Sequence, residues 1–334
     1  MTPAGVADDL RVAFFVSAYR SSAQLTRLVH TLRRAEPTSP IVIHDSFDSP
    51  LDPSLFDAVR DVHVLRTDRP IGWGDMSLEA ARWDVYRWIL QNLDVDWVML
   101  LSEQDYPIAP LANFRALLAS SGADAVMLGE RIDTLSADDL RIECTRRYLY
   151  RYVSLPSLGI EQRLPPASRR IAAGLRQRLY AAVNRLHPKI FIYQTPTAIP
   201  TPTRIGIRSG KTPFDGGFPC WFIGCWYALS RKALGHVIEY VDSHPEFVRY
   251  YARTVIPLES ATGSIVFNDP ELKVANLSLH AIRFSDPVSG RPDVFEDADL
   301  DFLRSSGGVF ARKFNPTNTD LLDELDKTIF ELRE

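Results

Sequence analysis

The chain has 334 residues, 46% of them hydrophobic, which is enough to bury the core of one large domain or of two modest ones. A formal net charge of −4 argues against attraction to nucleic acid or anionic membrane through overall charge, so we expect no nucleic-acid partner. The three cysteines are too few, and odd in number, for a secreted disulfide framework, so we expect buried, reduced thiols.

No segment has the pattern of a membrane span or of a signal peptide. Residues 1–9 are predicted to form a flexible N-terminal tail that lacks the basic stretch of a signal peptide. The first apolar run begins at Val12 and is short, as in a core strand, and no run reaches the roughly 20 apolar residues that a spanning helix needs. We therefore expect a cytoplasmic protein and leave open a peripheral attachment at the inner membrane surface.

Apolar runs alternate with amphipathic segments through the first 130 residues. Strands are predicted at 11–19, 40–46, 62–67, 96–102 and 124–130, and helices at 21–35, 52–61, 76–93 and 110–123. This alternation predicts an α/β sheet that is built from right-handed crossovers.

The pattern is looser after residue 140. We expect a basic amphipathic helix at 168–189, a Pro- and Gly-rich loop at 195–217, a strand, a break and a helix within 220–241, and a strand within 276–284. A helix, a glycine turn and a basic ending follow within 297–314. Because these late strands need a sheet partner, the two halves of the chain are predicted to interlock.

Polar residues follow three of the predicted strands, at Ser17–Arg20, His44–Asp48 and Ser102–Asp105. In α/β sheets, ligands bind outside the carboxyl ends of the strands, so we expect these residues to converge. The pair Glu103 and Asp105 has three interpretations: a cap for the following helix, a metal site with Asp-x-Asp spacing, or a sugar site beside Tyr106.

Four stretches, in order, resemble the core-2/I-branching N-acetylglucosaminyltransferases and the peptide xylosyltransferases of glycosyltransferase family 14. They are RVAFFVSAYRSSAQLTRLVHTL, GWGDMSLEAARWDVYRWIL with DWVMLLSEQDYPI, FIGCWYALSRKAL with VIPLES, and GGVFARKF. The resemblance implies a GT-A type fold, which is a Rossmann-like mixed sheet flanked by helices. Residues 10–334 would form one GT-A domain, with a nucleotide-binding half at 10–135 and an acceptor- and diphosphate-binding half at 136–334.

The resemblance also implies an inverting transfer from a UDP-sugar, with GlcNAc as the expected sugar, to a hydroxyl of an acceptor. The acceptor would be a glycan, a lipid-linked glycan or a small-molecule glycoside. Members of the family need no metal and no other cofactor, because basic side chains stabilise the charge that develops on the leaving UDP. Alternatives are UDP-xylose or another nucleotide sugar, a metal-dependent reaction through Glu103 and Asp105, and a glycan-binding protein without catalysis.

Residue roles follow from the same resemblance. Glu259, in the VIPLES segment, falls on the catalytic glutamate and would act as the base. Lys313 falls on the lysine that binds the diphosphate, with Arg312 beside it and Arg291 one residue out of step with a second family arginine. Cys225 occupies a position where xylosyltransferase-like members have an aspartate, which weakens the xylose alternative.

The remaining expected contacts lie at strand ends and around the aromatic residues. The nucleotide is expected to contact Ala18, Tyr19, His44, Asp45 and Trp73. The sugar and acceptor are expected to contact Glu103, Asp105, Tyr106, Trp226 and Tyr227.

The helix at 168–189 has a strongly basic face and an apolar stripe. We interpret it first as a surface helix that packs on the body of the protein with its charges in solvent. The alternative is a helix that lies on anionic lipid and makes a peripheral membrane contact.

Overall fold

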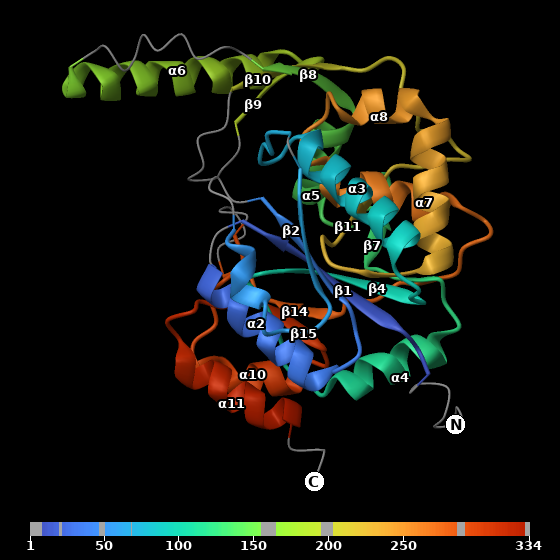
Figure 1. Ribbon diagram of the computed structural model, residues 1–334. Coiled ribbons are helices and arrows are strands. Elements are labelled where there is room, and N and C mark those ends of the chain that lie inside the picture. Colours follow the sequence, from blue (N-terminus) through green and yellow to red (C-terminus); the bar gives the residue numbers. More distant parts are fainter. Residues whose placement is uncertain are drawn as a thin grey trace.

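The computed structural model describes residues 9–19, 22–46, 51–67, 69–154, 165–194, 203–285 and 291–330, so residues 1–8 of the predicted tail lie outside the described part. A seven-stranded sheet in the order β13-β6-β12-β4-β1-β2-β3 runs through the molecule (Figure 1). Its strands are Val12–Ala18 (β1), Ile41–Asp45 (β2), Val62–Arg66 (β3), Trp97–Ser102 (β4), Ala125–Val126 (β6), Ala228–Ser230 (β12) and Val274–Ala275 (β13).

The sheet is mixed, as the α/β prediction requires. Strands β4, β1, β2 and β3 are parallel neighbours, while β12 pairs antiparallel with both β4 and β6. Because β12 and β13 come from the second half of the chain, the two halves share one sheet, and the prediction that they interlock is confirmed.

Helices cover both faces of the sheet. One face packs against Ser22–Ala35 (α2), Leu111–Ser121 (α4), Leu300–Ser305 (α10) and Thr319–Phe330 (α11). The core on the other face includes residues of Met76–Asn92 (α3), Asp138–Tyr148 (α5), Arg231–Ser243 (α7), Pro245–Tyr251 (α8) and Ala261–Asn268 (α9). Short 3₁₀ turns occur at Pro53–Phe56 (η1), Pro257–Glu259 (η3) and Asp297–Asp299 (η4).

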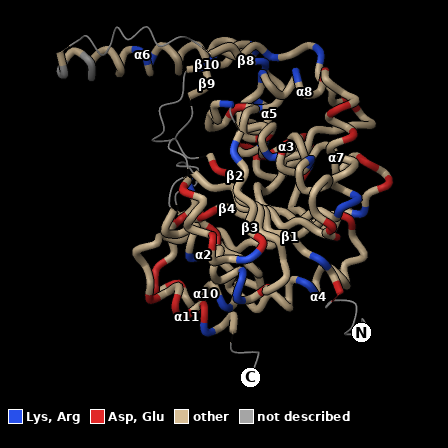
Figure 2. The backbone as a smooth tube through the Cα atoms, in the orientation of Figure 1, with Lys and Arg blue, Asp and Glu red and all other residues tan. Residues whose placement is uncertain are grey.

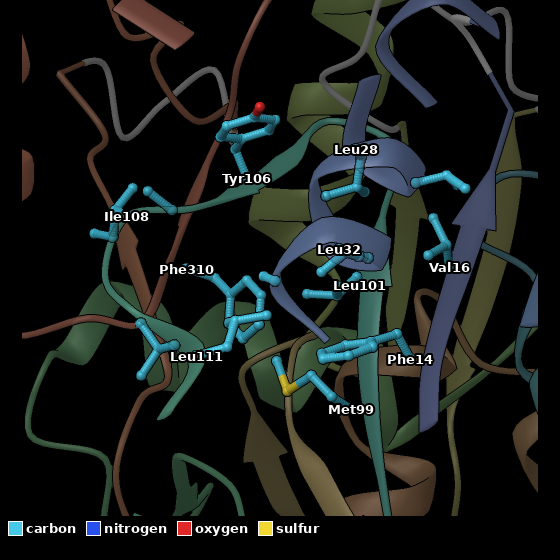
Figure 3. Packing of buried hydrophobic residues seen from close by; sticks show 14 of the residues in the cluster. Phe14, Val16, Leu28, Leu32, Met99, Leu101, Tyr106, Ile108, Leu111 and Phe310 are labelled. Atoms are coloured by element: carbon cyan, nitrogen blue, oxygen red, sulfur yellow. The ribbon is translucent and has the colours of Figure 1, made fainter. Parts of the chain in front are cut away.

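The alternation of side chains along β1 divides the core into two layers. Phe14 and Val16 lie in the layer beneath α2, as Figure 3 shows, whereas Ala13 and Phe15 lie in the layer beneath α3. All seven residues of β1 are buried, because a central parallel strand is covered on both sides.

Three smaller sheets complete the fold. His280–Ile282 (β14), Phe310–Arg312 (β15) and Asp105–Pro107 (β5) form one sheet, and Gly129–Arg131 (β7) pairs with Trp221–Ile223 (β11). The third sheet contains Tyr150–Ser154 (β8), Arg204–Arg208 (β10) and Ile190–Tyr193 (β9), and Pro166–Leu186 (α6) lies next to it in Figure 1.

Three element predictions need correction. The predicted strand 124–130 is divided into β6 and β7, because β6 pairs with β12 and β13 while β7 pairs with β11 in another sheet. The predicted helix 52–61 is only the short turn η1. The predicted loop 195–217 contains β10, which is held by pairing with β8 and β9; residues 195–202 lie outside the described part.

No helix in the described part of the chain is long and apolar enough to cross a membrane.

Candidate active site

The carboxyl ends of β1, β2 and β4 meet at one edge of the central sheet. Ser17 stands opposite Ser102 of β4, and Ala18 stands opposite Asp45 of β2. The predicted convergence of the three polar strand ends is therefore confirmed for the residues that the structure describes. Arg20 and residues 47–50 lie outside them.

The C-terminal strand β15 reaches this edge because it pairs with β5, which places Arg312 opposite Asp105. Arg312 donates from Nη1 to Oδ1 of Asp105 at 2.9 Å and also to the hydroxyl of Ser102. The backbone N–H of Ser102 donates to Oδ2 of Asp105 at 2.7 Å, and Nε2 of His280 lies 3.5 Å from the same oxygen. Both carboxylate oxygens of Asp105 are thus engaged by protein groups.

Asp105 is completely buried and acts as the anion that fixes Arg312. Burial opposes its ionisation, but Arg312 and then His280 hold the pKa of its carboxyl below the usual value. A charge-assisted pair of this kind positions a guanidinium more rigidly than a surface pair does.

Trp226 is surrounded by cationic and aromatic side chains. The guanidinium carbon of Arg312 lies 4.8 Å from the centroid of its ring, and that of Arg82 lies 5.7 Å away. The ring of His280 is 5.9 Å from the ring of Trp226, centroid to centroid. The face of an indole ring attracts cations, so Trp226 makes cation–π contacts with the arginines on both α3 and β15.

Arg82 and Glu79 are both buried in α3, where they form an ion pair at 3.7 Å. Glu79 also accepts a hydrogen bond from the hydroxyl of Thr262 in α9. The sequence pattern of α3 predicted an apolar inner face. The structure shows that this buried charged pair also lies on that face, and Arg82 contacts Trp226 of the site.

Glu259 ends the turn η3 and holds its carboxylate between two partners. Arg147 of α5 donates from Nη1 to Oε2 at 2.7 Å, and Sγ of Cys225 lies 3.5 Å from Oε1. A thiol is a weak donor, so Oε1 retains the capacity to accept a proton. The side chain of Glu259 is 24% exposed, which gives a ligand access to it.

The backbone around Glu259 is set by a close approach of two distant segments. Ile256, just before η3, has a φ of 54°, which is unusual for a β-branched residue. Its N–H donates to the carbonyl of Gly74 at 2.9 Å, and Arg204 donates to the same carbonyl at 3.0 Å. Gly74 itself has a φ of +72°, which a glycine adopts without penalty.

This contact also places Trp73 near Glu259. Trp73 and Cys225 both pack against a small cluster that includes Leu258, the residue before Glu259, and Cys225 also contacts the carboxylate of Glu259. The structure therefore joins the tryptophan–glycine segment with the glutamate segment, as the sequence resemblance implies for one site.

The dipeptide of Cys225 and Trp226 connects the two groups described so far. Cys225 contacts the carboxylate of Glu259, and Trp226 contacts the guanidinium of Arg312. The carboxylate of Glu259 and the fixed guanidinium of Arg312 therefore contact two consecutive residues.

Glu103 lies at the same sheet edge but is completely covered. Neither of its carboxylate oxygens has a hydrogen-bond partner. Burial raises the pKa of Glu103 to about 7, although Arg312 opposes the shift. Glu103 is therefore closed off from solvent in this arrangement, and it is partly protonated near neutral pH.

Two of the predicted sugar contacts do not fit their placement. Tyr106 is fully buried, and its hydroxyl lies 2.7 Å from both the hydroxyl of Thr31 and Oδ1 of Asp326, which links α2 to α11. Tyr227 is 1% exposed and its hydroxyl accepts a hydrogen bond from that of Tyr86 at 3.1 Å, inside the layer beneath α3. Neither ring has a free face for a sugar, because the packing of the core covers both.

The predicted nucleotide contacts lie at the ends of β1 and β2. His44 is buried with Nδ1 2.9 Å from the hydroxyl of Ser46, and burial lowers its pKa to about 4, so it is neutral at physiological pH. Asp45 accepts from the N–H of Leu51 at 2.9 Å and from Arg66 at 3.1 Å. Ala18 is buried at the end of β1 and Tyr19 follows it, half-buried.

Lys313 follows Arg312 and is half-buried. The N–H of the next residue, Phe314, donates to the carbonyl of Gln104 at 2.9 Å, which fixes this stretch to the end of β4. The N–H of Lys313 donates to Asp293 at 3.3 Å, so the segment that begins at the exposed Arg291 runs beside it.

Three residues of this region, Arg147, Arg82 and His280, were not predicted from the sequence. Arg82 is recognisable in hindsight as a charge on the inner face of a helix, and His280 as a lone polar residue in an apolar strand. Arg147 belongs to a basic, aromatic segment that gives no sign of pairing with a residue 112 positions away.

A separate cavity of about 470 Å³ lies between α5 and the ends of β9 and β10. It is next to Glu259 by way of α5, because Arg147 points to the glutamate while its neighbour Arg146 lines the cavity. The guanidinium of Arg146 stacks on Phe191 at 4.3 Å, and Arg141, Arg208 and His187 also line the cavity, which gives it a basic character.

In the part of the chain that the structure describes, no three His, Cys, Asp or Glu side chains are grouped so as to hold a metal ion.

Residues 12–211, more than half of the chain, match the model of the Core-2/I-Branching enzyme family. The chain belongs to this family. It is therefore a glycosyltransferase, and the sheet described above is that of a GT-A type fold. The matched residues include the ends of β1, β2 and β4 but not Glu259 or Lys313. Membership of the family implies a nucleotide-sugar donor and a glycan acceptor.

The other comparisons add little. The comparison with curated proteins found no match. Among solved structures, a putative glucose-1-phosphate thymidylyltransferase from Bacillus anthracis, in complex with a sucrose, is 9% identical, with a TM-score of 0.30 and coverage of 68% of this chain and 75% of that chain. HddC from Yersinia pseudotuberculosis is 11% identical, with a TM-score of 0.27 and coverage of 67% and 78%. With TM-scores this low, we base no conclusion on either similarity.

Proposed function

We propose that this glycosyltransferase moves a sugar, GlcNAc by family resemblance, from a UDP-sugar to a hydroxyl of its acceptor, with inversion and without a metal. The observation that carries the proposal is that Glu259 and Arg312 contact the consecutive residues Cys225 and Trp226, respectively. Inversion in one step needs a base on one side of the sugar and stabilisation of the leaving diphosphate on the other.

In the proposed reaction, Oε1 of Glu259 takes the proton of the acceptor hydroxyl. The hydroxyl oxygen forms a bond to the anomeric carbon while the bond from that carbon to the β-phosphate oxygen breaks. The electron pair of the broken bond stays on UDP, which gains negative charge. Arg147 supports the step by holding Oε2 at 2.7 Å, so that Oε1 faces the acceptor.

The cations near β15 are proposed to stabilise the departing UDP. Arg312 already uses Nη1 for Asp105 and Ser102, so we assign it the role of positioning the strand end. By family resemblance, Lys313 and Arg291 are the direct partners of the diphosphate. Their segments run side by side through the backbone contact of Lys313 with Asp293.

The proposal of a metal-free reaction rests on the state of Asp105. A divalent ion needs carboxylate oxygens that are available as ligands. Both oxygens of Asp105 are engaged by Arg312, Ser102 and His280, and Glu103 is buried away from solvent. A metal at this pair would have to displace a buried ion pair.

For the acceptor, we propose the cavity beside α5. Part of its lining comes from the segments 146–157 and 190–217, through Arg146, Leu149, Tyr150, Ile190, Phe191 and Arg208. Loops of this kind usually decide which substrate a common scaffold accepts. The nucleoside is proposed to lie at the ends of β1 and β2, near Tyr19, Asp45 and Trp73.

The test is the release of UDP from UDP-GlcNAc, UDP-xylose and other UDP-sugars, measured with excess chelator present. We expect slow release from one preferred donor, and a loss of about a hundredfold or more in the Glu259→Gln variant, as removal of a general base typically causes. Glu239→Gln is the matched control and should release UDP like the wild type, because Glu239 is an exposed glutamate of α7.

Each outcome has a defined meaning. Activity that chelator abolishes and Mn²⁺ restores would contradict the metal-free proposal. Release by Glu259→Gln at the wild-type rate would remove Glu259 as the base. Absence of turnover with every donor, together with binding of glycans, would favour a binding protein over an enzyme.

A further inference from the structure

The most exposed aliphatic side chains are concentrated on one part of the surface. Six of them are more than 60% exposed: Val153 (70%), Ile171 (66%), Leu175 (61%), Leu179 (61%), Leu186 (72%) and Ile207 (61%). All six belong to α6 or to the neighbouring strands β8 and β10. Elsewhere in the described residues no large hydrophobic side chain is more than 48% exposed.

Four of the six form a stripe along α6. Ile171, Leu175, Leu179 and Leu186 are separated by four, four and seven residues, so they share one face of the helix. A helix that packed on the body of the protein would bury this stripe. The first interpretation of the helix, as one that packs its apolar face on the body, is therefore wrong for the described residues.

The helix is attached to the body through its C-terminal part. Asn184 donates to the carbonyl of Ile192 at 3.0 Å and accepts from the N–H of the same residue at 2.7 Å, which fixes this end to β9. Figure 1 shows the rest of α6 extending away from the sheet. The four side chains of the stripe are 61–72% exposed.

Charge indicates what covers the stripe. Between residues 162 and 214 the sequence has ten Lys and Arg residues and no Asp or Glu, although the whole chain has a net charge of −4. Arg178 and Arg185 are exposed and lie next to Leu179 and Leu186, at the edge of the stripe. Figure 2 shows basic residues and no acidic ones on this helix.

We propose that α6 lies on the surface of an anionic lipid bilayer. An exposed aliphatic face flanked by arginines is the pattern of helices that insert their apolar side into the headgroup region, where the arginines contact lipid phosphates. A second copy of the chain is a poorer partner, because pairing of two α6 helices would bring their arginines together without acidic residues between them. The proposal is independent of the proposed transfer reaction, since it concerns location only.

The test uses co-sedimentation of the full chain with vesicles of phosphatidylglycerol or of phosphatidylcholine, in low salt. We expect binding to the anionic vesicles that falls with added salt, and little binding to the zwitterionic ones. Arg178→Gln with Arg185→Gln should weaken binding by roughly tenfold or more, since each basic residue near an anionic surface contributes appreciably. Leu175→Gln with Leu179→Gln should weaken it as well.

Matched controls test whether the loss of binding is specific to α6 or follows from removing any exposed charge or leucine. Arg60→Gln with Arg249→Gln removes two exposed charges outside α6, and Leu277→Gln alters an exposed leucine that is 37% accessible. These variants should bind like the wild type, and all variants should keep the wild-type melting temperature because every altered side chain is at the surface.

Two results would overturn the proposal. One is equal binding to anionic vesicles by the wild type and both α6 variants. The other is a wild-type dimer in gel filtration that Leu175→Gln with Leu179→Gln converts to a monomer without any vesicle binding, because the stripe would then be an interface between copies.

Discussion

Nη1 of Arg147 lies 2.7 Å from Oε2 of Glu259, although 112 residues separate the two in the chain. Nε of the same arginine donates to Glu143 at 2.9 Å, so one guanidinium holds two carboxylates in a fixed arrangement. This relationship explains how a short turn after a strained residue presents a carboxylate in one orientation, and it leads to the first prediction.

Arg147→Lys should lower kcat by about tenfold to a hundredfold while leaving the KM for the donor nearly unchanged. Lysine keeps the positive charge but cannot donate to Glu143 and Glu259 from one planar group, so the base loses its orientation rather than its charge partner. Steady-state UDP release measures both constants. Arg87→Lys, a surface pair on α3, is the control and should change neither. An unchanged kcat in Arg147→Lys would show that the arginine is not a positioning residue.

Glu103 predicts a pH dependence of stability. Its pKa is about 7 in the folded protein against an ordinary 4.5, so between these values the folded state binds more protons than the unfolded state. The free energy of unfolding should therefore fall as pH rises through this range, by about 3 kcal/mol in total, and the loss is complete above pH 7. Below pH 4.5 the effect is absent.

Urea denaturation at pH 4.5 and at pH 8 measures this effect. Relative to the wild type, Glu103→Gln should gain about 3 kcal/mol between the two pH values, because glutamine has no proton to lose. The exposed Glu239→Gln of α7 is the control and should keep the wild-type pH profile. A profile for Glu103→Gln that parallels the wild type would contradict the assignment.

Arg312 and Asp105 should prove strongly coupled. Removing one partner of a buried ion pair leaves an uncompensated charge, which typically costs about 3–5 kcal/mol. Arg312→Gln and Asp105→Asn should each destabilise the protein substantially, and the double variant should be destabilised by less than the sum. Urea denaturation of the three variants gives the coupling energy, and strictly additive effects would show that the two side chains do not depend on each other.

Tyr106→Phe distinguishes a structural tyrosine from a sugar contact. The hydroxyl joins Thr31 of α2 to Asp326 of α11. Figure 3 shows the ring of Tyr106 beside the packed core. Its loss should lower the free energy of unfolding by about 1–3 kcal/mol, since buried partners are left unsatisfied. The KM values for donor and acceptor should stay the same. A raised KM with unchanged stability would restore the sugar-binding role that the sequence suggested.

The sequence predicted the first half of the fold well because its signals are local. The apolar run of β1 and the amphipathic pattern of α2 depend only on the spacing of residues along the chain, and both elements occur where they were expected. The segment 124–130 has an equally apolar pattern, yet the structure divides it, because strand pairing with β12 and β11 is a property of the tertiary fold.

The candidate site likewise has features that were predicted from the sequence and features that only the structure shows. Glu259, Arg312 and Trp226 were identified as candidate residues from motifs in the sequence. In the structure Arg312 contacts Trp226, and Glu259 contacts the preceding residue, Cys225. The partners that hold them could not be read from spacing. Arg147 and His280 reach the site only because α5 and β14 pack beside it. Tyr106 was predicted as a site residue, but its ring is buried and its hydroxyl bonds to residues of α2 and α11.

The sequence by itself determined the class of the fold, the convergence of three polar strand ends and the family of the protein, since periodicity and motifs are properties of the chain alone. Only the tertiary structure decided which charges are paired, which aromatic rings are covered and that the stripe of α6 is uncovered. Burial and pairing depend on which surfaces meet in space, and residues far apart in the chain supply those surfaces.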